Sequence, residues 1–282
     1  MKDNSYQLNT EISTYEDLVL PETLYKYRDW NTPIQREIIS KKEVYFAPPS
    51  SFVDPFDCKI PTRWDLLSHN EILNKYYTIS IETNPDFLTH AQHIEFAVHW
   101  ANNTAINHPE FVKVHHQKQF SDHSVRTGVL CLTEFDNSMD MWERYSMKHT
   151  GFCIGFNPAI MLKGIGGGGG KVLYNSELPI IYPAPKHSYS LQANLQVFSK
   201  LTDWEFEQEY RTYIFRPKPL NTSDRIFKVP EEGYKELIFG ARTPNSTIKK
   251  IIESIPEGLN HMMIKRAYID NGEIIIRPFE TA

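Results

Sequence analysis

The stretch Cys131-Leu-Thr-Glu-Phe-Asp-Asn-Ser-Met-Asp-Met-Trp-Glu-Arg-Tyr-Ser-Met-Lys-His-Thr-Gly-Phe-Cys-Ile-Gly-Phe156 predicts a strand, a helix and a second strand in succession. Apolar residues at 129–132 favour the first strand, and the polar run 136–138 offers side-chain oxygens that cap a helix. Gly151 then ends the helix, and residues 152–156 resume as a strand. Three apolar residues recur at helical spacing, and we expect them to pack mainly in the core: Met139, Trp142 and Tyr145.

The composition is that of an ordinary globular protein, and we expect one domain over residues 1–282. Hydrophobic residues make up 40% of the 282 residues and charged residues 23%. The formal net charge of −5 argues against a general basic surface for nucleic acid, because such a surface replaces phosphate counterions with many Lys and Arg.

Cysteine usage and hydropathy predict a cytoplasmic protein without a membrane segment. Cys58, Cys131 and Cys153 show no metal-ligand spacing, and the last two lie in apolar runs, as buried thiols in a reducing compartment do. The polar start of the chain lacks the pattern of a secretion signal, and no run approaches eighteen apolar residues.

The remaining pattern mixes helices and strands without regular alternation, which predicts an α+β fold with a mixed, mainly antiparallel sheet. Residues 61–122 are expected to form a helical insertion, with an apolar face at Phe87, Ala91, Ile94, Val98 and Ala101. The glycine run 166–170 is interpreted as a surface loop, since it does not fit a phosphate-binding motif. Further strands are expected at 23–28, 43–47, 171–174, 180–182, 226–229, 236–239, 262–269 and 273–279, and helices at 189–201 and 244–254.

The segment Asp54-Pro55-Phe56-Asp57 predicts a fixed turn at the edge of a cleft. Pro55 sets its own φ and biases Asp54 away from helix, while the Asp oxygens can cap nearby amides. We expect Phe56 to be buried beneath this turn.

A set of motifs in order along nearly the whole chain resembles a bacterial family, "domain of unknown function 2971". Val53 departs from it, because the family places Asn before the Asp-Pro-Phe. The motifs are Leu24-Tyr25-Lys26-Tyr27-Arg28, Phe52 with Asp54-Pro55-Phe56-Asp57, Cys131-Leu132-Thr133-Glu134, Met141-Trp142 with Tyr145 and His149, Gly151-Phe152-Cys153-Ile154-Gly155-Phe156, Trp204 with Glu207, Glu209-Tyr210-Arg211, and Phe239-Gly240.

The order of elements also resembles, more distantly, the ADP-ribosyltransferase superfamily. That resemblance implies that a basic residue of the first strand, a Ser of the second and a Glu of a later strand bind and activate NAD. The matching residues are Arg28, then Ser50 or Ser51, then Glu209, with Glu207 two positions earlier.

NAD cleavage would suit these residues chemically. A carboxylate stabilises the positive charge that develops on the ribose, and Glu207 and Glu209 would share a face if both lay on a strand. An arginine fork suits a pyrophosphate, and the rings of Tyr25, Tyr27 or Trp142 could enclose a base. His149 and Arg211 could hold an anion or orient the Glu, so we expect His149 or Arg144 to lie roughly 5–6 Å from Glu207, Glu209 or Arg211.

The leading hypothesis is therefore an enzyme that consumes NAD, by transferring ADP-ribose to a macromolecule or by hydrolysis, as a toxin or antiphage effector does. Two alternatives stay open. One is a metal-dependent nuclease or phosphodiesterase with Asp54, Asp57, Glu207 and Glu209. The other is a non-catalytic ligand-sensing or interaction module, in which the same polar residues stabilise the core. The sequence does not identify a macromolecular acceptor.

Overall fold

The computed structural model, which describes residues 20–106, 108–166 and 169–280, has an α+β fold. An eight-stranded mixed sheet forms its body, in the order β12-β11-β10-β4-β1-β3-β8-β5. Only β10 and β11 pair in parallel within this sheet, while its other neighbours are antiparallel. The predicted fold class is confirmed.

The strands are β1 (Leu24–Arg28), β2 (Glu43–Tyr45), β3 (Thr127–Thr133), β4 (Phe152–Phe156), β5 (Gly169–Lys171), β6 (Leu173–Asn175), β7 (Ser199–Leu201), β8 (Glu209–Phe215), β9 (Ile226–Lys228), β10 (Tyr234–Phe239), β11 (Met263–Asp270) and β12 (Glu273–Pro278). The α-helices are α1 (Pro33–Ser40), α2 (His69–Thr83), α3 (His90–Asn102), α4 (Pro109–Arg126), α5 (Met139–Tyr145), α6 (Pro158–Gly164), α7 (Tyr189–Phe198) and α8 (Asn245–Glu253).

The stretch from Cys131 to Phe156 forms the expected strand, helix and strand, as β3, α5 and β4. Ser138 caps α5 by accepting a hydrogen bond from the Met141 amide at 3.3 Å. The helix ends at Tyr145, earlier than Gly151, and positive φ values at residues 147–149 reverse the chain before β4. β1 lies between β4 and β3, so the two strands of this stretch are not neighbours.

The centre of the sheet is buried on both faces, and β4 shows this in its side chains. Phe152, Ile154 and Phe156 pack in the larger core cluster, whereas Cys153 points to the other face and packs with Trp142 of α5. All four strand residues are fully buried. Such a strand reads as one continuous apolar run, because neither of its sides faces water.

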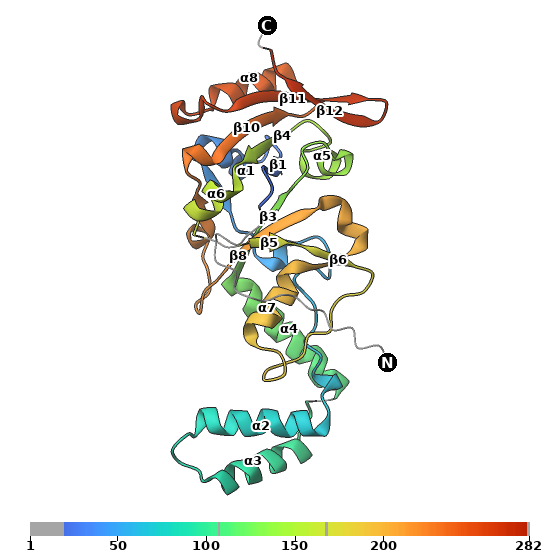
Figure 1. The fold of residues 1–282 in the computed structure, drawn as a ribbon, viewed down its shortest axis with the longest axis vertical. Helices are drawn as coiled ribbons and strands as arrows, with labels where there is room; N and C mark the ends of the chain where they lie inside the picture. Colours follow the sequence, from blue (N-terminus) through green and yellow to red (C-terminus); the bar gives the residue numbers. More distant parts are fainter. Residues whose placement is uncertain (1–19, 107, 167–168, 281–282) are drawn as a thin grey trace.

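Three helices occupy the predicted insertion, and α2 and α3 extend from one end of the elongated molecule (Figure 1). The predicted apolar face, which begins before α3, is wrong for most of its members, although Ala101 is buried. Phe87 is 85% exposed, and Ile94 and Val98 are 45% and 43% exposed. The buried side of α3 instead carries small residues and His93, whose Nδ1 lies 2.8 Å from the Ser80 hydroxyl of α2. A buried polar pair thus sets how these two helices meet.

Other expectations need local corrections. Gly169 and Gly170 belong to β5 and pair with β8, so they do not form a loop, while residues 167–168 lie outside the described residues. The expected strand at 180–182 is a single bridge from Ile181 to Thr62. The expected strand at 171–174 is divided between β5 and β6.

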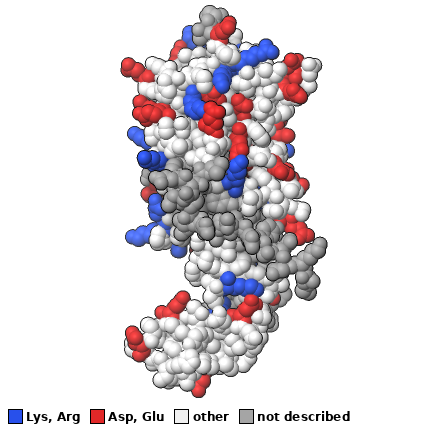
Figure 2. Space-filling model, viewed as in Figure 1, with Lys and Arg blue, Asp and Glu red and all other residues white. Residues whose placement is uncertain are grey.

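Within the described ranges, no helix is both long and apolar enough to cross a membrane. Lys and Arg are interspersed with Asp and Glu on the face that Figure 2 shows.

Candidate functional site

Two adjoining hollows open where β1 and β3 diverge. β1 pairs with β4 along its whole length, but it pairs with β3 only at Tyr25 and Thr133. One hollow, of about 220 Å³, extends toward α1 and β2, and the other, of about 250 Å³, extends toward α5 and β8. Residues that line both join them into one groove: Lys26, Arg28, Phe52 and Cys131.

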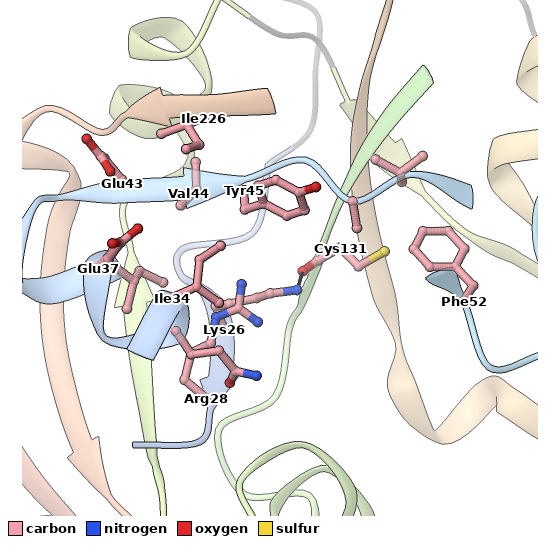
Figure 3. Close-up of a pocket in the computed structure, with 14 residues that line it drawn as sticks. Lys26, Arg28, Ile34, Glu37, Glu43, Val44, Tyr45, Phe52, Cys131 and Ile226 are labelled. Carbon is pink, nitrogen blue, oxygen red and sulfur yellow. Dashed lines mark hydrogen bonds between the residues drawn. The ribbon is translucent and has the colours of Figure 1, made fainter. Parts of the chain in front are cut away.

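Two cations from β1 lie where the hollows meet. Lys26 and Arg28 are two residues apart on a strand, so they share a face, and both are half-buried. The Lys26 ammonium donates to the main-chain oxygen of Cys131, as the side chains in Figure 3 show. Arg28 donates to its neighbour's carbonyl at 3.4 Å. Neither forms an ion pair with any carboxylate in the described part of the chain.

Burial lowers the pKa of both cations. The pKa of Lys26 falls to about 8, with Arg28 as the second cause, and Cys131, Glu209 and Glu207 offset only part of this effect. Burial likewise lowers the pKa of Arg28 to about 10. Two partly desolvated like charges without an acidic partner are unfavourable, and an anion between them would relieve both.

A buried network of charges forms the far wall of the second hollow. The Lys200 ammonium of β7 contacts Glu207 and lies 3.0 Å from Glu209 Oε1 and 3.4 Å from Asp57 Oδ2. The Arg211 guanidinium is fully buried and binds Asp57 through two hydrogen bonds of 2.7 and 2.8 Å. Arg211 also donates to Glu209 through Nε. Three carboxylates therefore surround two cations.

Local backbone geometry brings these carboxylates together. Glu207 ends a 3₁₀ helix at Thr202–Glu207, and Gln208 adopts a left-handed conformation with φ of 39° before Glu209 starts β8. The two Glu residues therefore do not share a strand face, which corrects that expectation. Asp57 comes from the predicted turn, in which the Phe56 amide donates to Asp54 Oδ1 at 2.9 Å.

The acidic side chains of this turn point into the protein, and Phe56 points outward. Phe56 is 48% exposed, so its predicted burial is wrong. Asp54 and Asp57 are 4% and 5% exposed. Asp57 turns toward Arg211 because a bidentate pair compensates the burial of both charges. Phe56, which lies between the two acids, is left on the outer side of the turn.

The two glutamates titrate as a coupled pair whose pKa values diverge. Burial, with the adjacent Glu209, raises the pKa of Glu207 to about 8. Burial acts on Glu209 in the same direction, but Arg211, a hydrogen bond from Glu207 and Lys200 together hold its pKa well below the usual range. The pKa values of the two carboxyls are thus shifted in opposite directions, as in the carboxyl pairs that enzymes use as acid and base.

The predicted site residues divide into three groups. Arg28, Tyr25, Tyr27, Ser51, Glu207 and Glu209 line the groove. Arg211 lies beneath it and supports Glu209 and Asp57. Ser50, Trp142 and His149 do not line either hollow. Ser50 and Ser51 belong to a 3₁₀ turn, Pro49–Ser51, and not to a strand end.

Trp142 belongs to the core, where its ring meets that of Tyr27 edge to face at 4.9 Å and its Nε1 donates to Asp136 O. His149 is 2% exposed, and its ring lies 3.3 Å from Glu143.

The central stretch and the glutamate segment do meet, through a residue that we expected in the core. The Tyr145 hydroxyl, at the end of α5, donates to Glu207. Arg144 lies over the rings of Trp204 and Phe206, at 5.7 and 4.7 Å, and its approach to the glutamates or Arg211 stays a prediction. His149 lies beyond the end of the helix, so it does not share a helical face with Trp142 and Tyr145.

Sequence reasoning did not select Lys26, Lys200, Tyr145 or Trp204 as ligand-binding residues, although all four line the groove. The alternation of β1 contained a clue to one of them, because Lys26 shares a strand face with Arg28. Lys200 follows a helix in a short strand, and nothing near it in the sequence shows that three acids converge on it.

The charge network does not favour the metal-dependent alternative. The Lys200 ammonium occupies the position between Asp57, Glu207 and Glu209 where a cation would bind. Asp54 takes part in the turn and not in this cluster.

No family model, curated protein or solved structure matches the chain in our comparisons. The resemblances to "domain of unknown function 2971" and to the ADP-ribosyltransferases therefore stay predictions.

Proposed function

We propose that the groove binds a nucleotide through its phosphates and that the protein consumes NAD. One observation carries this proposal. Lys26 and Arg28, two cations without a carboxylate partner, line the same groove as Glu207 and Glu209, whose pKa values are shifted in opposite directions. A pyrophosphate is the natural ligand of the cations, because it offers several anionic oxygens to an ammonium and a guanidinium. The distant likeness to the ADP-ribosyltransferases names NAD as the nucleotide.

The proposed reaction breaks the bond between ribose C1′ and the nicotinamide nitrogen. The electron pair of that bond leaves with nicotinamide, and water or an acceptor nucleophile forms the new bond to C1′ and releases one proton. Ionised Glu209 lines the groove, and its negative charge stabilises the cationic ribose in the transition state. Glu207 is 1% exposed, so it acts on Glu209 by hydrogen bonding and not on the substrate.

Aromatic side chains give the second hollow a place for the nicotinamide ring. Tyr25, Tyr145 and Trp204 line it together with Glu209. Flat rings bind a heterocycle by stacking or edge contacts, and they exclude water from the reacting carbon.

A non-catalytic nucleotide sensor is the second candidate, and one observation favours it. Glu209 already binds both Lys200 and Arg211, and such paired carboxylates also occur in purely structural networks. In a sensor the cations would bind the phosphates while the network only shapes the groove.

The test is nicotinamide release from NAD by the purified protein, with EDTA and with added magnesium. We expect turnover that is unaffected by EDTA. The double variant Lys26→Met/Arg28→Met should bind NAD at least about tenfold more weakly, because it lacks the charges that hold the phosphates. Its free energy of unfolding should not fall, because the variant removes two partly desolvated charges. Lys113→Met on the exposed surface of α4 is the matched control.

Two outcomes would favour another candidate, and two would refute the proposal. Turnover that requires magnesium would support a metal-dependent enzyme. NAD binding without turnover would support the sensor. Absence of both NAD binding and turnover would refute the proposal, and so would full affinity in the double variant.

A further inference from the structure

The β11–β12 hairpin ends the sheet, at the end of the molecule opposite α2 and α3 (Figure 1). Asn271 and Gly272 have φ values of 50° and 84° and form its two-residue turn. Asp270 and Glu273 are the first cross-strand pair after this turn. β12 has no further strand beside it within the described chain, so one of its edges is unpaired.

The even-numbered residues of β12 direct their main-chain N–H and C=O groups toward the unpaired edge. The Phe279 amide donates to Ile264 O at 2.9 Å, toward β11. Hydrogen bonding alternates along an antiparallel strand, so Ile274 and Ile276 direct their N–H and C=O groups away from β11. Pro278 follows in the same phase, where its missing N–H removes no bond to β11.

The hairpin also carries two cross-strand pairs of like charge. Arg266 lies directly opposite Arg277, and Asp270 lies directly opposite Glu273. None of the four side chains forms an ion pair with another described residue. Both guanidinium groups lie within 6.0 Å of the Tyr268 ring. Like charges directly opposite each other destabilise a strand pair, so both ends of this hairpin would gain from an oppositely charged neighbour.

From this arrangement we infer that β12 pairs with β12 of a second copy of this chain, antiparallel and centred on Ile275. In this register Glu273 lies opposite Arg277 of the partner subunit, and Arg277 opposite the partner's Glu273. At each end of the paired strands, four charged residues then lie side by side across neighbouring strands. Their order is Asp270, Glu273, the partner's Arg277 and the partner's Arg266. The two unfavourable pairs thus become neighbours of opposite sign.

The hydrogen-bonding phase supports the same register. Ile274 and Ile276 lie opposite the partner's Ile276 and Ile274, so the outward main-chain groups form about four hydrogen bonds. Glu273 and Arg277 then occupy positions without main-chain bonds, where facing side chains lie closest. A shift by two residues in either direction keeps the backbone phase but removes both Glu–Arg pairs. Charge therefore selects one register among those that the backbone permits.

Pairing at this edge would not cover the proposed nucleotide groove. β11, β10 and β4 separate β12 from β1, where the groove opens. The inference is therefore independent of the proposed function. Two short strands bury little area, so we expect a weak dimer with a dissociation constant of roughly 10–100 µM.

Sedimentation velocity on the full chain, up to about 200 µM, tests the dimer. We expect a species near twice the 32.9 kDa of one chain at high concentration. Glu273→Arg and Arg277→Glu alone should each raise the dissociation constant at least about tenfold, because each places like charges opposite one another. The double variant Glu273→Arg/Arg277→Glu should restore it to near the wild-type value.

Ile276→Pro is a second probe, because it removes an outward N–H without changing any charge, and it should also weaken the dimer. A wild-type protein that stays monomeric throughout would overturn the inference. Dimerisation that the single charge reversals leave unchanged would overturn it too, since another surface would then carry the contact. Failure of the double variant to recover would exclude the proposed register.

Discussion

Replacement of Lys200 by Met removes one of the two cations that balance the buried carboxylates. The Lys200 ammonium contacts Glu207 and lies 3.0 Å from Glu209 and 3.4 Å from Asp57. Met keeps most of the side-chain volume but leaves buried negative charge without compensation. Breaking a buried ion pair in this way costs about 3–5 kcal/mol, a large part of the roughly 5–15 kcal/mol that stabilises a typical domain.

Urea unfolding at pH 7 measures this cost, with Lys249→Met as the control. The Lys249 side chain is 79% exposed and 3.9 Å from Glu253, so its loss should cost less than about 1 kcal/mol. The deficit of Lys200→Met should shrink toward pH 5, because loss of the ammonium raises the pKa of the buried carboxylates, which then take up protons. Unfolding free energies within about 1 kcal/mol of the wild type at pH 7 would show that Lys200 does not compensate the buried carboxylates.

Four further predictions address single features. The pKa of Glu207 is raised from 4.5 to about 8, so the folded state binds a proton more tightly than the unfolded state does. The free energy of unfolding should therefore fall as pH rises between these values, by at most about 1.4 kcal/mol per pH unit. In urea unfolding, Glu207→Gln should remove most of this pH dependence. Affinity for pyrophosphate should fall as pH rises through about 8, where Lys26 loses its proton, and Lys26→Arg should remove that fall in calorimetric titrations. Gly151→Ala would place a Cβ 2.1 Å from the carbonyl oxygen of Arg28, so thermal unfolding should show a loss of about 1–3 kcal/mol or more. Phe87→Ser should change stability by less than about 0.5 kcal/mol, because Phe87 is 85% exposed; a larger loss would mean that it packs in a core.

Local pattern was sufficient to predict much of the fold. The alternation at Leu24–Arg28 and the apolar run at Phe152–Phe156 indicate strands, and Ser138 with the spacing after it indicates α5. Their order in the sheet could not be obtained this way. β1 lies between β3 and β4, which are distant from it in the chain, and side-chain packing decides that pairing.

The spacing of apolar residues did not predict most of the buried face of α3, because it does not show which face of a helix packs against another helix. The apolar residues Phe87, Ile94 and Val98 are exposed, while His93 forms a buried hydrogen bond with Ser80. A polar residue can occupy a helix interface when its partner is present, and that partner lies on another helix. The sequence shows both residues, but it does not show that they lie in contact in the fold.

Part of the candidate site was accessible from the sequence and part was not. Arg28, Glu207 and Glu209, which were chosen from the sequence, line the groove, while their role toward NAD stays a prediction. The charge network is assembled from Asp57, Lys200 and Arg211, which belong to three separate segments. The raised pKa values of Lys200 and Arg211 depend on burial and on distances to carboxylates, which no local spacing encodes.

A crystal structure of the protein with ADP-ribose bound tests the proposed function most directly, since that ligand keeps the pyrophosphate and the reacting ribose. The proposed function predicts phosphate oxygens within hydrogen-bonding distance of Lys26 and Arg28 and the C1′ end of the ribose in the hollow beside Glu209. A ligand bound away from the groove, or one whose phosphates contact neither cation, would contradict it.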